Sequence, residues 1–138
     1  MAKKQPIELG EAELAVMRVL WEEGPLTVRD VMNRLHDRGR RVAYTTVLTF
    51  LTRLEQKGMV AADKRDQAYV YRSKVSKESV TTSRLRALVD QLYDGAAAPM
   101  LLHLMEHERF TPDELAKLRR LIDELDEGTA GGESSETR

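Results

Sequence analysis

Residues 43–58 read Ala-Tyr-Thr-Thr-Val-Leu-Thr-Phe-Leu-Thr-Arg-Leu-Glu-Gln-Lys-Gly, and this stretch decides the fold. At a repeat of 3.6 residues its apolar side chains gather on one face. They are Val47, Leu48, Leu51 and Leu54. The other face carries hydroxyls and cations, namely Thr45, Thr46, Thr49, Arg53 and Lys57. The pattern predicts a helix with one buried face and one polar, basic face, and Gly58 supplies its stop signal.

The threonines of this helix have a chemical use beyond helix formation. Their β-branching lowers the preference for helix, whereas their hydroxyls suit phosphate oxygens and the edges of bases. This chemistry favours a helix that enters a groove of DNA. The alternative is a core helix whose polar face is only solvated.

Two helices are predicted before this one. The first spans residues 11–23 and ends at Gly24-Pro25. The second spans residues 28–37, with Thr27 as N-cap and Asp30 three residues later in a capping-box arrangement. The residues expected to face inward are Leu14, Met17, Leu20 and Trp21 in the first helix, and Val28, Val31, Met32 and Leu35 in the second.

A hairpin is predicted after the third helix, because the apolar period changes there from 3.6 toward 2. Residues 59–63 and 68–72 are predicted as two short strands, and the loop between them carries Lys64 and Arg65. Three helices and a basic hairpin make a winged helix, in which the third helix enters the major groove and the wing reaches the flanking backbone. The predicted fold class is therefore mainly α with a small β-hairpin wing.

The winged-helix hypothesis gives each element a role on double-stranded DNA. The predicted contacts are Thr45, Thr46 and Thr49 in the groove; Ala43 and Tyr44 near the backbone; Arg53, Lys64 and Arg65 on phosphates; and Thr27 and Val28, whose backbone amides lie beside a phosphate. An ion pair within the domain is the alternative for Arg53. The alternative for the whole module is a winged helix used only for protein contacts.

Charge is distributed unevenly along the chain, although the net charge is only -1. Residues 27–75 carry 11 Lys and Arg against 5 Asp and Glu, a net +6, whereas residues 76–138 carry 8 against 13, a net -5. The basic part coincides with the predicted groove-entering helix. This asymmetry is typical of a DNA-binding domain joined to an acidic body, although a solvated basic surface would also produce it.

Three further helices are predicted, at about 76–94, 97–107 and 112–127. Their wide leucine stripes exceed what a segment of this length buries alone, so a second copy of the chain is the predicted cover. The predicted homodimer residues are Leu85, Leu88, Leu92, Met100, Leu101, Leu104, Leu115, Leu118, Leu121, Ile122 and Leu125. The predicted domains are a winged helix at 7–74, a helical dimerisation domain at 75–127 and a disordered acidic tail at 128–138.

Several function classes are excluded by the sequence. The absence of cysteine excludes disulfides, thiolate metal sites and a cysteine nucleophile. Neither a glycine-rich phosphate loop nor a Gly-x-Ser-x-Gly elbow occurs. No apolar run reaches the roughly 18 residues of a membrane span, and the N-terminus lacks the apolar segment of a signal peptide. The sequence predicts a cytoplasmic protein that is not an enzyme, has no membrane partner and needs no cofactor.

One pattern resembles a metal site. The run from His103 to His107 matches the His-x-x-Glu-His of inverted zinc peptidases, and its spacing puts both imidazoles on one helical face. Those enzymes need a further ligand and a large cleft, and this helix is predicted to use its apolar side for packing. No metal site is predicted, and a metal-responsive repressor that uses His103 and His107 is kept as an alternative.

Three motifs occur in order along the chain. They are Glu13-Leu14-x-Val16-Met17-x-Val19-Leu20-Trp21, then Thr46-Val47 with Arg53-Leu54-x-x-Lys57-Gly58, then Tyr69-x-Tyr71. In this order and spacing the chain resembles, over nearly its full length, the penicillinase repressor family of bacterial winged-helix regulators, the BlaI/MecI/CopY group.

The resemblance implies a homodimeric repressor on palindromic operators of a β-lactamase gene and of its own gene. It also implies that antibiotic or cell-wall stress lifts repression through loss of the dimer. In staphylococcal and bacillary relatives a sensor-linked protease triggers cleavage between an Asn and a Phe in the dimerisation domain. Leu102-His103-Leu104 stands there in this chain, which is a departure from the pattern. Copper-responsive relatives carry C-terminal cysteine pairs, which this chain lacks.

Overall fold

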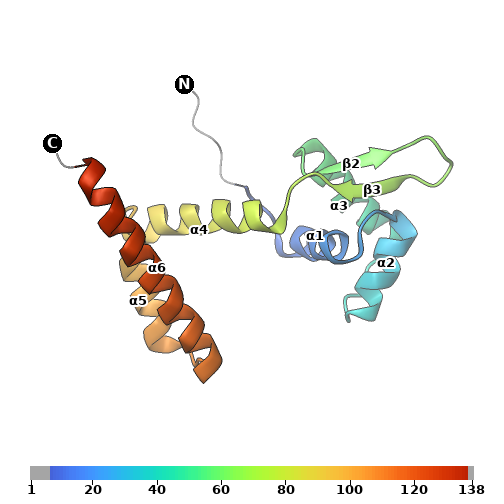
Figure 1. Cartoon of the computed structure of the whole chain (residues 1–138). Coiled ribbons are helices and arrows are strands. Elements are labelled where there is room, and N and C mark those ends of the chain that lie inside the picture. The colour runs from blue at the N-terminus through green and yellow to red at the C-terminus, as the bar shows by residue number, and fades with distance from the viewer. Residues whose placement is uncertain (1–6, 137–138) are drawn as a thin grey trace. The chain divides into compact units, whose positions relative to one another are not determined.

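The computed structural model describes the backbone of residues 7–136 and the side chains of residues 7–129. The chain divides after Gly95 into two compact units (Figure 1). The first unit is called the head and the second the C-terminal unit.

Three helices form the centre of the head: α1 (Glu11–Glu23), α2 (Val28–Asp37) and α3 (Tyr44–Gln56). Each helix packs against the other two. Gly24 ends α1 with a φ of 82°, a backbone conformation that residues with a Cβ rarely adopt. The helix order and bounds confirm the three predicted helices.

A three-stranded antiparallel sheet completes the head, with β1 (Leu26–Thr27), β2 (Val60–Asp63) and β3 (Val70–Ser73) in the order β1-β3-β2. β2 and β3 form the predicted hairpin, in the register Val60 opposite Ser73. The strand β1 was not predicted. It pairs with β3 on the side away from β2, so the wing is tied to the start of α2. The mainly α winged-helix fold with a β-hairpin wing is confirmed.

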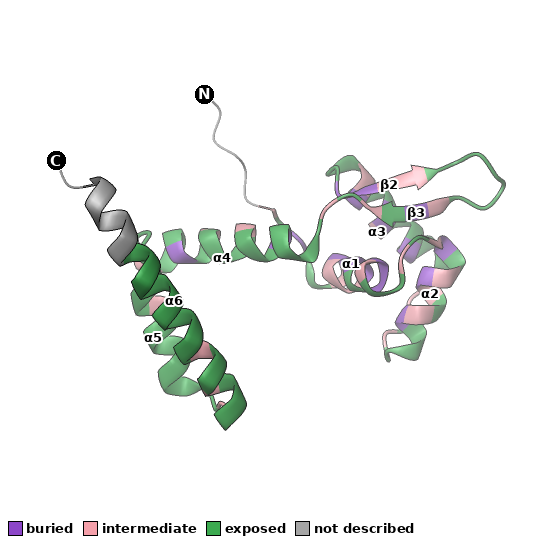
Figure 2. Cartoon of the chain, in the orientation of Figure 1, coloured by how far each residue is buried: buried purple, intermediate pink, exposed green. Residues whose placement is uncertain are grey.

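The core of the head is formed by apolar residues from all three helices and from the sheet (Figure 2). In α3, Val47, Leu51 and Leu54 are fully buried, as predicted. Leu48 differs from the prediction: its side chain remains 37% exposed. It projects from the edge of the apolar stripe into a groove described below.

The helix α4 (Lys77–Tyr93) follows the sheet and belongs to the head rather than to the C-terminal unit. Its Val80 is buried in the head core, and the Ser83 hydroxyl accepts a 2.9 Å hydrogen bond from the Ile7 backbone N–H. The predicted boundary at residues 74 and 75 therefore differs from the observed division. The difference arises because one face of α4 is apolar enough to extend the head core.

The C-terminal unit consists of α5 (Ala97–His107) and α6 (Pro112–Glu136). Thr111 caps α6 by accepting a 3.1 Å hydrogen bond from the Glu114 N–H. α6 continues through Gly128, where a disordered tail was predicted, and residues 137 and 138 of that tail lie outside the described residues. Backbone hydrogen bonds can propagate an established helix through residues of low propensity, since the costly nucleus is already formed. Among the described helices, none is long and apolar enough to cross a membrane.

Candidate nucleic-acid interface

The exposed face of α3 presents a row of hydroxyls from its first turns. Tyr44, Thr45, Thr46 and Thr49 are all exposed, and so is Ala43 at the N-cap position. The Thr49 hydroxyl donates a 3.0 Å hydrogen bond to the Thr45 carbonyl. Because that bond uses the hydroxyl hydrogen but leaves oxygen lone pairs free, Thr49 can still accept a hydrogen bond from a base edge.

The opposite end of α3 is held by a partly buried ion pair. Lys57 Nζ donates a 2.8 Å hydrogen bond to Glu13 Oε1 of α1 and another of 3.1 Å to the Glu8 carbonyl. Burial opposes the ionisation of Glu13, but the hydrogen bonds from Lys57 and from the Gly10 N–H outweigh it, so the pKa of Glu13 lies below its ordinary value. Lys57 had been grouped with the polar face of the helix, whereas the structure gives it an anchoring position.

Arg53 lies in the last turn of α3 and is exposed. No carboxylate among the described residues lies within 4.0 Å of its guanidinium. Its charge nevertheless lowers the pKa of Glu13 by a weak Coulomb interaction. The alternative of an ion pair within the head is therefore not formed in the described part of the chain, and the exposed guanidinium is compatible with the predicted phosphate contact.

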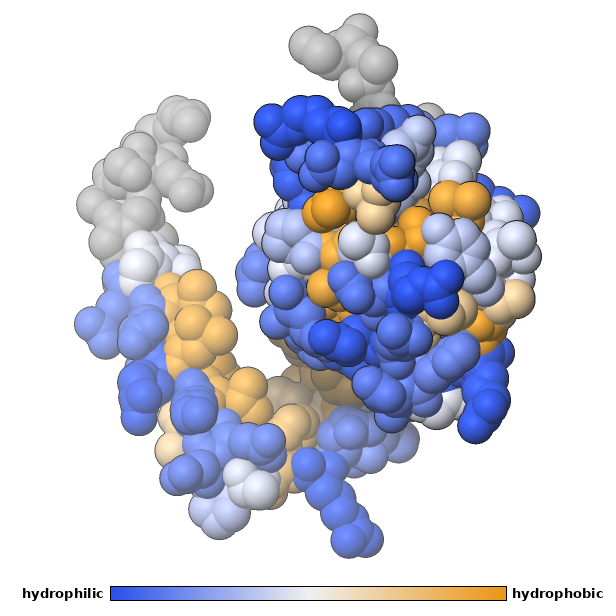
Figure 3. Space-filling view, turned by 90° about the vertical axis from the view of Figure 1, so that its right-hand side faces the viewer, coloured by the Kyte–Doolittle hydropathy of each residue, from blue (hydrophilic) through white to orange (hydrophobic). Residues whose placement is uncertain are grey.

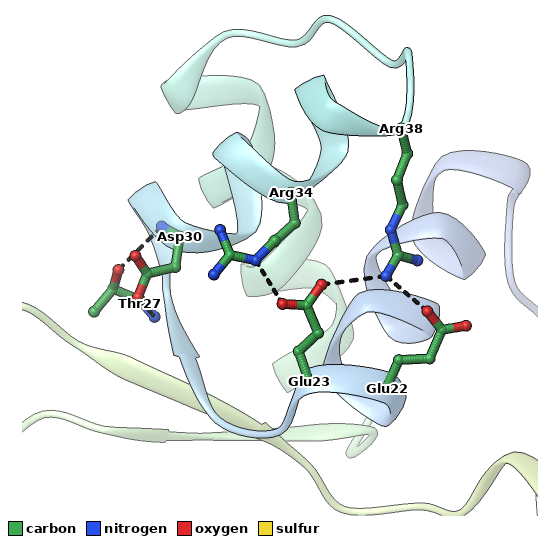
Figure 4. Close-up of polar contacts among 6 residues, drawn as sticks. All are labelled: Glu22, Glu23, Thr27, Asp30, Arg34 and Arg38. Carbon is green, nitrogen blue, oxygen red and sulfur yellow. Dashed lines mark hydrogen bonds and ion pairs between the residues drawn. The ribbon is translucent and has the colours of Figure 1, made fainter.

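The N-terminus of α2 is fixed by a reciprocal capping box. The Thr27 hydroxyl accepts a 3.1 Å hydrogen bond from the Asp30 N–H, and Asp30 Oδ2 accepts one of 3.4 Å from the Thr27 N–H (Figure 4). The Val28 side chain is buried, so only its backbone is suited to the predicted role beside a phosphate. At the other end of α2, Arg34 and Arg38 bind Glu23 of α1 (Figure 4). These contacts set the direction of the helix.

The two predicted wing cations already have carboxylate partners. Arg65 makes a bidentate ion pair with Asp63, with Nη2 at 2.7 Å from Oδ2, and these hydrogen bonds lower the pKa of Asp63 to about 2. Lys64 Nζ lies 3.5 Å from Glu55 Oε2 of α3. Both pairs are largely exposed, so water weakens them and a phosphate can compete for the cations.

A groove of about 360 Å³ joins the three elements to which DNA contacts were assigned. Its lining comes from the start of α2, the start of α3 and the end of the wing loop: Thr27, Val28, Arg29, Tyr44, Leu48, Gln67, Ala68 and Tyr69. Figure 3 shows apolar surface surrounded by hydrophilic surface on the side of the head where α2 and the wing lie. The structure thus brings Thr27, Val28 and Tyr44 together around one hollow.

The prediction of site residues missed five residues that line this groove: Arg29, Leu48, Gln67, Ala68 and Tyr69. Arg29 is exposed, and its guanidinium carbon lies 5.6 Å from the centroid of the Tyr44 ring. Its position one residue after Val28 was a usable signal. Leu48 gave no such signal, because its helical spacing fits the apolar stripe and only the packing shows that it is left at the edge.

The two histidines of α5 form a close pair with rings tilted by 34° to each other. Their ring centroids are 4.3 Å apart, and His107 Nδ1 lies 2.8 Å from the His103 carbonyl oxygen. Since a carbonyl can only accept, this contact requires the hydrogen on Nδ1 of His107. Residues 7–129 contain no group of three or more His, Asp or Glu side chains that could hold a metal ion.

The fold and the exposed, partly basic face of α3 define a winged-helix protein of the DNA-binding class. Comparison with known proteins agrees: the sequence profile of the penicillinase repressor family matches residues 9–124. The chain belongs to this family of transcriptional repressors. Family membership confirms the prediction of a DNA-binding transcriptional repressor rather than an enzyme.

Individual relatives cover most of the chain. It is similar to the transcriptional regulator BlaI of Mycobacterium tuberculosis, with 37% identity over 87% of this chain and 86% of the relative. It is also similar to the penicillinase repressor of Staphylococcus aureus, with 23% identity over 91% of this chain and 98% of the relative. Among solved structures, RosR of H. salinarum is similar in fold, with a TM-score of 0.50, 17% identity and coverage of 91% of this chain and 99% of that one.

Proposed function

We propose that the protein is a homodimeric repressor that binds palindromic operators of a β-lactamase gene and of its own gene. The observation that carries the DNA-binding part is the division of α3 into two faces. Val47, Leu51 and Leu54 are fully buried in the head, whereas the hydroxyls of Thr45, Thr46 and Thr49 are exposed. Such a helix can enter the major groove without loss of the head core.

The dimer is proposed from the apolar surface of α5 and α6, together with the exposed Leu85, Leu88 and Leu92 of α4. No side chain of α5 is buried, and none of residues 112–129 in α6 is buried. Large apolar side chains are at least half exposed on both helices: Leu101, Leu102, Leu121, Ile122 and Leu125. Several large apolar side chains exposed on adjacent helices are typical of a protein contact. A second copy of the same unit would cover it symmetrically.

The palindrome follows from two-fold symmetry, because two heads related by a dyad present the same α3 to inverted half-sites. The link to a β-lactamase gene rests on the penicillinase repressor relative in Staphylococcus aureus. We propose that antibiotic or cell-wall stress lifts repression through loss of the dimer, with a sensor-linked protease as the partner. The segment Leu102-His103-Leu104 lies in α5 and is exposed. It does not contain the Asn-Phe peptide bond that is cleaved in the staphylococcal and bacillary relatives.

Fluorescence anisotropy on DNA from the gene's own promoter and on scrambled DNA tests this proposal. A salt series from about 50 to 200 mM separates specific binding from charge attraction, since phosphate contacts make affinity fall steeply with salt. We expect promoter binding at least about 10³-fold tighter than binding to scrambled DNA, with two chains per site. Equal, weak binding to both DNAs would favour a protein-contact module, and a change in affinity on adding zinc or copper would favour a metal-responsive repressor.

A matched variant pair assigns that binding to α3. Thr46→Val keeps the shape and β-branching of an exposed side chain but removes its hydroxyl, so it should weaken promoter binding and leave scrambled-DNA binding unchanged. Thr81→Val is the control, because Thr81 is exposed on α4, where its hydroxyl bonds the Lys77 carbonyl. If both variants bind the promoter as the wild type does, the groove role of Thr46 is wrong.

A further inference from the structure

The groove between α2, α3 and the wing is lined by apolar side chains and two tyrosines beside polar ones. Leu48 is exposed although it is apolar, and the buried Val28 side chain and Ala68 lie beside it. Tyr44 comes from α3 and Tyr69 from the wing, and each residue is 43% exposed. The hollow therefore offers apolar contact to a ligand on a face that is otherwise polar.

Cations lie over both tyrosines. The Arg29 guanidinium carbon and Lys64 Nζ each lie 5.6 Å from the centroid of a ring, that of Tyr44 and that of Tyr69 respectively. Lys64 also has Glu55 as an ion-pair partner. Among the described residues, no carboxylate lies within 4.0 Å of Arg29. Its charge is therefore available to an anion that enters the groove.

We propose that this groove binds one sugar-phosphate segment of the DNA backbone, with the deoxyribose against Leu48 and the tyrosines and the phosphate on Arg29. This inference rests on the proposed function. A DNA strand alternates anionic phosphates with apolar sugar faces, which matches a cation beside apolar side chains. The groove also holds hydrogen-bonding side chains, among them Thr27 and Gln67, which suit phosphate and sugar oxygens. The base-reading role stays with the exposed threonines of α3.

Arg29 then has a different role from the two wing cations. Lys64 and Arg65 must exchange a carboxylate for a phosphate when they bind DNA, whereas Arg29 gains its first anionic partner. The Tyr44 ring restricts the guanidinium before binding, which reduces the side-chain entropy that the contact costs. Arg29 is thus a backbone contact that adds affinity to every DNA sequence.

Arg29→Ala tests the phosphate half of the proposal. The probe is promoter DNA in which single phosphates are replaced by neutral methylphosphonates, one position at a time. Methylphosphonate replacement should lower the affinity of the wild type at several phosphate positions. At one of these positions in each half-site, the replacement should no longer change the affinity of Arg29→Ala. The variant should also lower the salt slope by about 1 for each head, on promoter and scrambled DNA alike.

Arg18→Ala is the matched control, because Arg18 is an exposed arginine of α1 outside the groove. It should leave both the slope and the methylphosphonate pattern as in the wild type. Leu48→Ala tests the sugar half: it should weaken binding to both DNAs by a similar factor without a change in salt slope. Thermal melting checks that each variant is folded.

Arg29→Ala with wild-type slope and pattern would overturn the proposal. The proposal would also be overturned if Arg29→Ala lost the sequence preference at one base pair but kept the wild-type response to every methylphosphonate. Arg29 would then contact a base rather than a phosphate. The measurement on scrambled DNA keeps this test apart from the proposed function. If the wild type shows no promoter preference but Arg29→Ala still lowers the slope, the operator proposal fails and the groove proposal stands.

Discussion

The winged-helix core of α1, α2, α3 and the sheet uses apolar side chains in the opposite way to the C-terminal unit, and the end of α4, with Leu92 67% exposed, resembles the latter. In the head, side chains from three helices and a sheet enclose one another, and Val16, Met17 and Leu51 are fully buried. In the C-terminal unit, leucines of comparable size remain exposed, up to 61% at Leu125. The difference indicates that the head is stable through its own core, whereas the surface of α5 and α6 is suited to a partner.

A charge on the apolar surface of α6 should have the largest effect on operator binding. Leu121→Asp introduces a carboxylate at a side chain that is 52% exposed in the single chain, so the monomer should still fold. In the proposed dimer this charge would be buried, which is costly. We expect monomers in analytical ultracentrifugation and a loss of about 10²- to 10⁴-fold in operator affinity, since two linked heads bind far more tightly than one.

Ala116→Asp is the control for that variant, because it introduces the same group on an exposed position of the same helix. It should remain dimeric. If Leu121→Asp remained a dimer of normal mass, this face of α6 would not be the dimer interface. The exposed leucines of the C-terminal unit would then need another explanation.

Removal of a buried leucine should affect the head alone. Leu51→Ala leaves a cavity beside α1 and α2 and should lower the free energy of unfolding of the head by about 2–5 kcal/mol, measured by urea denaturation. Leu48→Ala on the same helix should cost clearly less, because its side chain is 37% exposed. Equal losses from the two variants would mean that Leu48 is as enclosed as Leu51.

The Glu13–Lys57 pair provides a smaller, pH-dependent contribution to the head. Glu13→Gln should lower the free energy of unfolding at pH 7 by on the order of 1 kcal/mol, since Lys57 is partly exposed and water screens the pair. The folded-state pKa of Glu13 lies below its ordinary value of 4.5. The stabilisation is therefore complete above pH 4.5 and is lost as the pH falls through the folded-state pKa.

Urea denaturation of wild type and Glu13→Gln from pH 7 down to pH 3 measures this effect. The two curves of stability against pH should converge in acid. Glu11→Gln is the control, because Glu11 is a highly exposed glutamate of the same helix in a surface pair with Arg40. A constant gap between wild type and Glu13→Gln at every pH would mean that the carboxylate charge is not what holds α3 to α1.

The helices and the wing were predictable from sequence because their signals are local. The N-caps Thr27 and Thr111 and the stop at Gly24 act within a few residues. The strand β1 was missed because two residues carry no periodicity, and only pairing with β3 makes them a strand. The tail was misjudged from Gly128 onward because composition does not report how far an established helix propagates.

The candidate site was predictable in its elements but not in its details. Spacing placed Thr45, Thr46 and Thr49 on the exposed face. Spacing could not show that Lys57 pairs with Glu13, that Leu48 lines a groove, or that the Arg29 guanidinium lies over the Tyr44 ring. Each of these depends on contacts between elements far apart in the chain.

The wing should give the smallest effect on stability and a moderate one on DNA binding. Replacing Lys64 and Arg65 together with alanine removes two exposed ion pairs that water screens, so the free energy of unfolding should hardly change. Binding to all DNA should weaken similarly, and the salt slope should fall by up to about 2 for each head. Anisotropy across the salt series measures the slope. Both cations already have carboxylate partners, so a fall in salt slope smaller than that of Arg29→Ala would show that such paired cations contribute less to DNA binding. An unchanged salt slope would mean that the wing does not contact DNA.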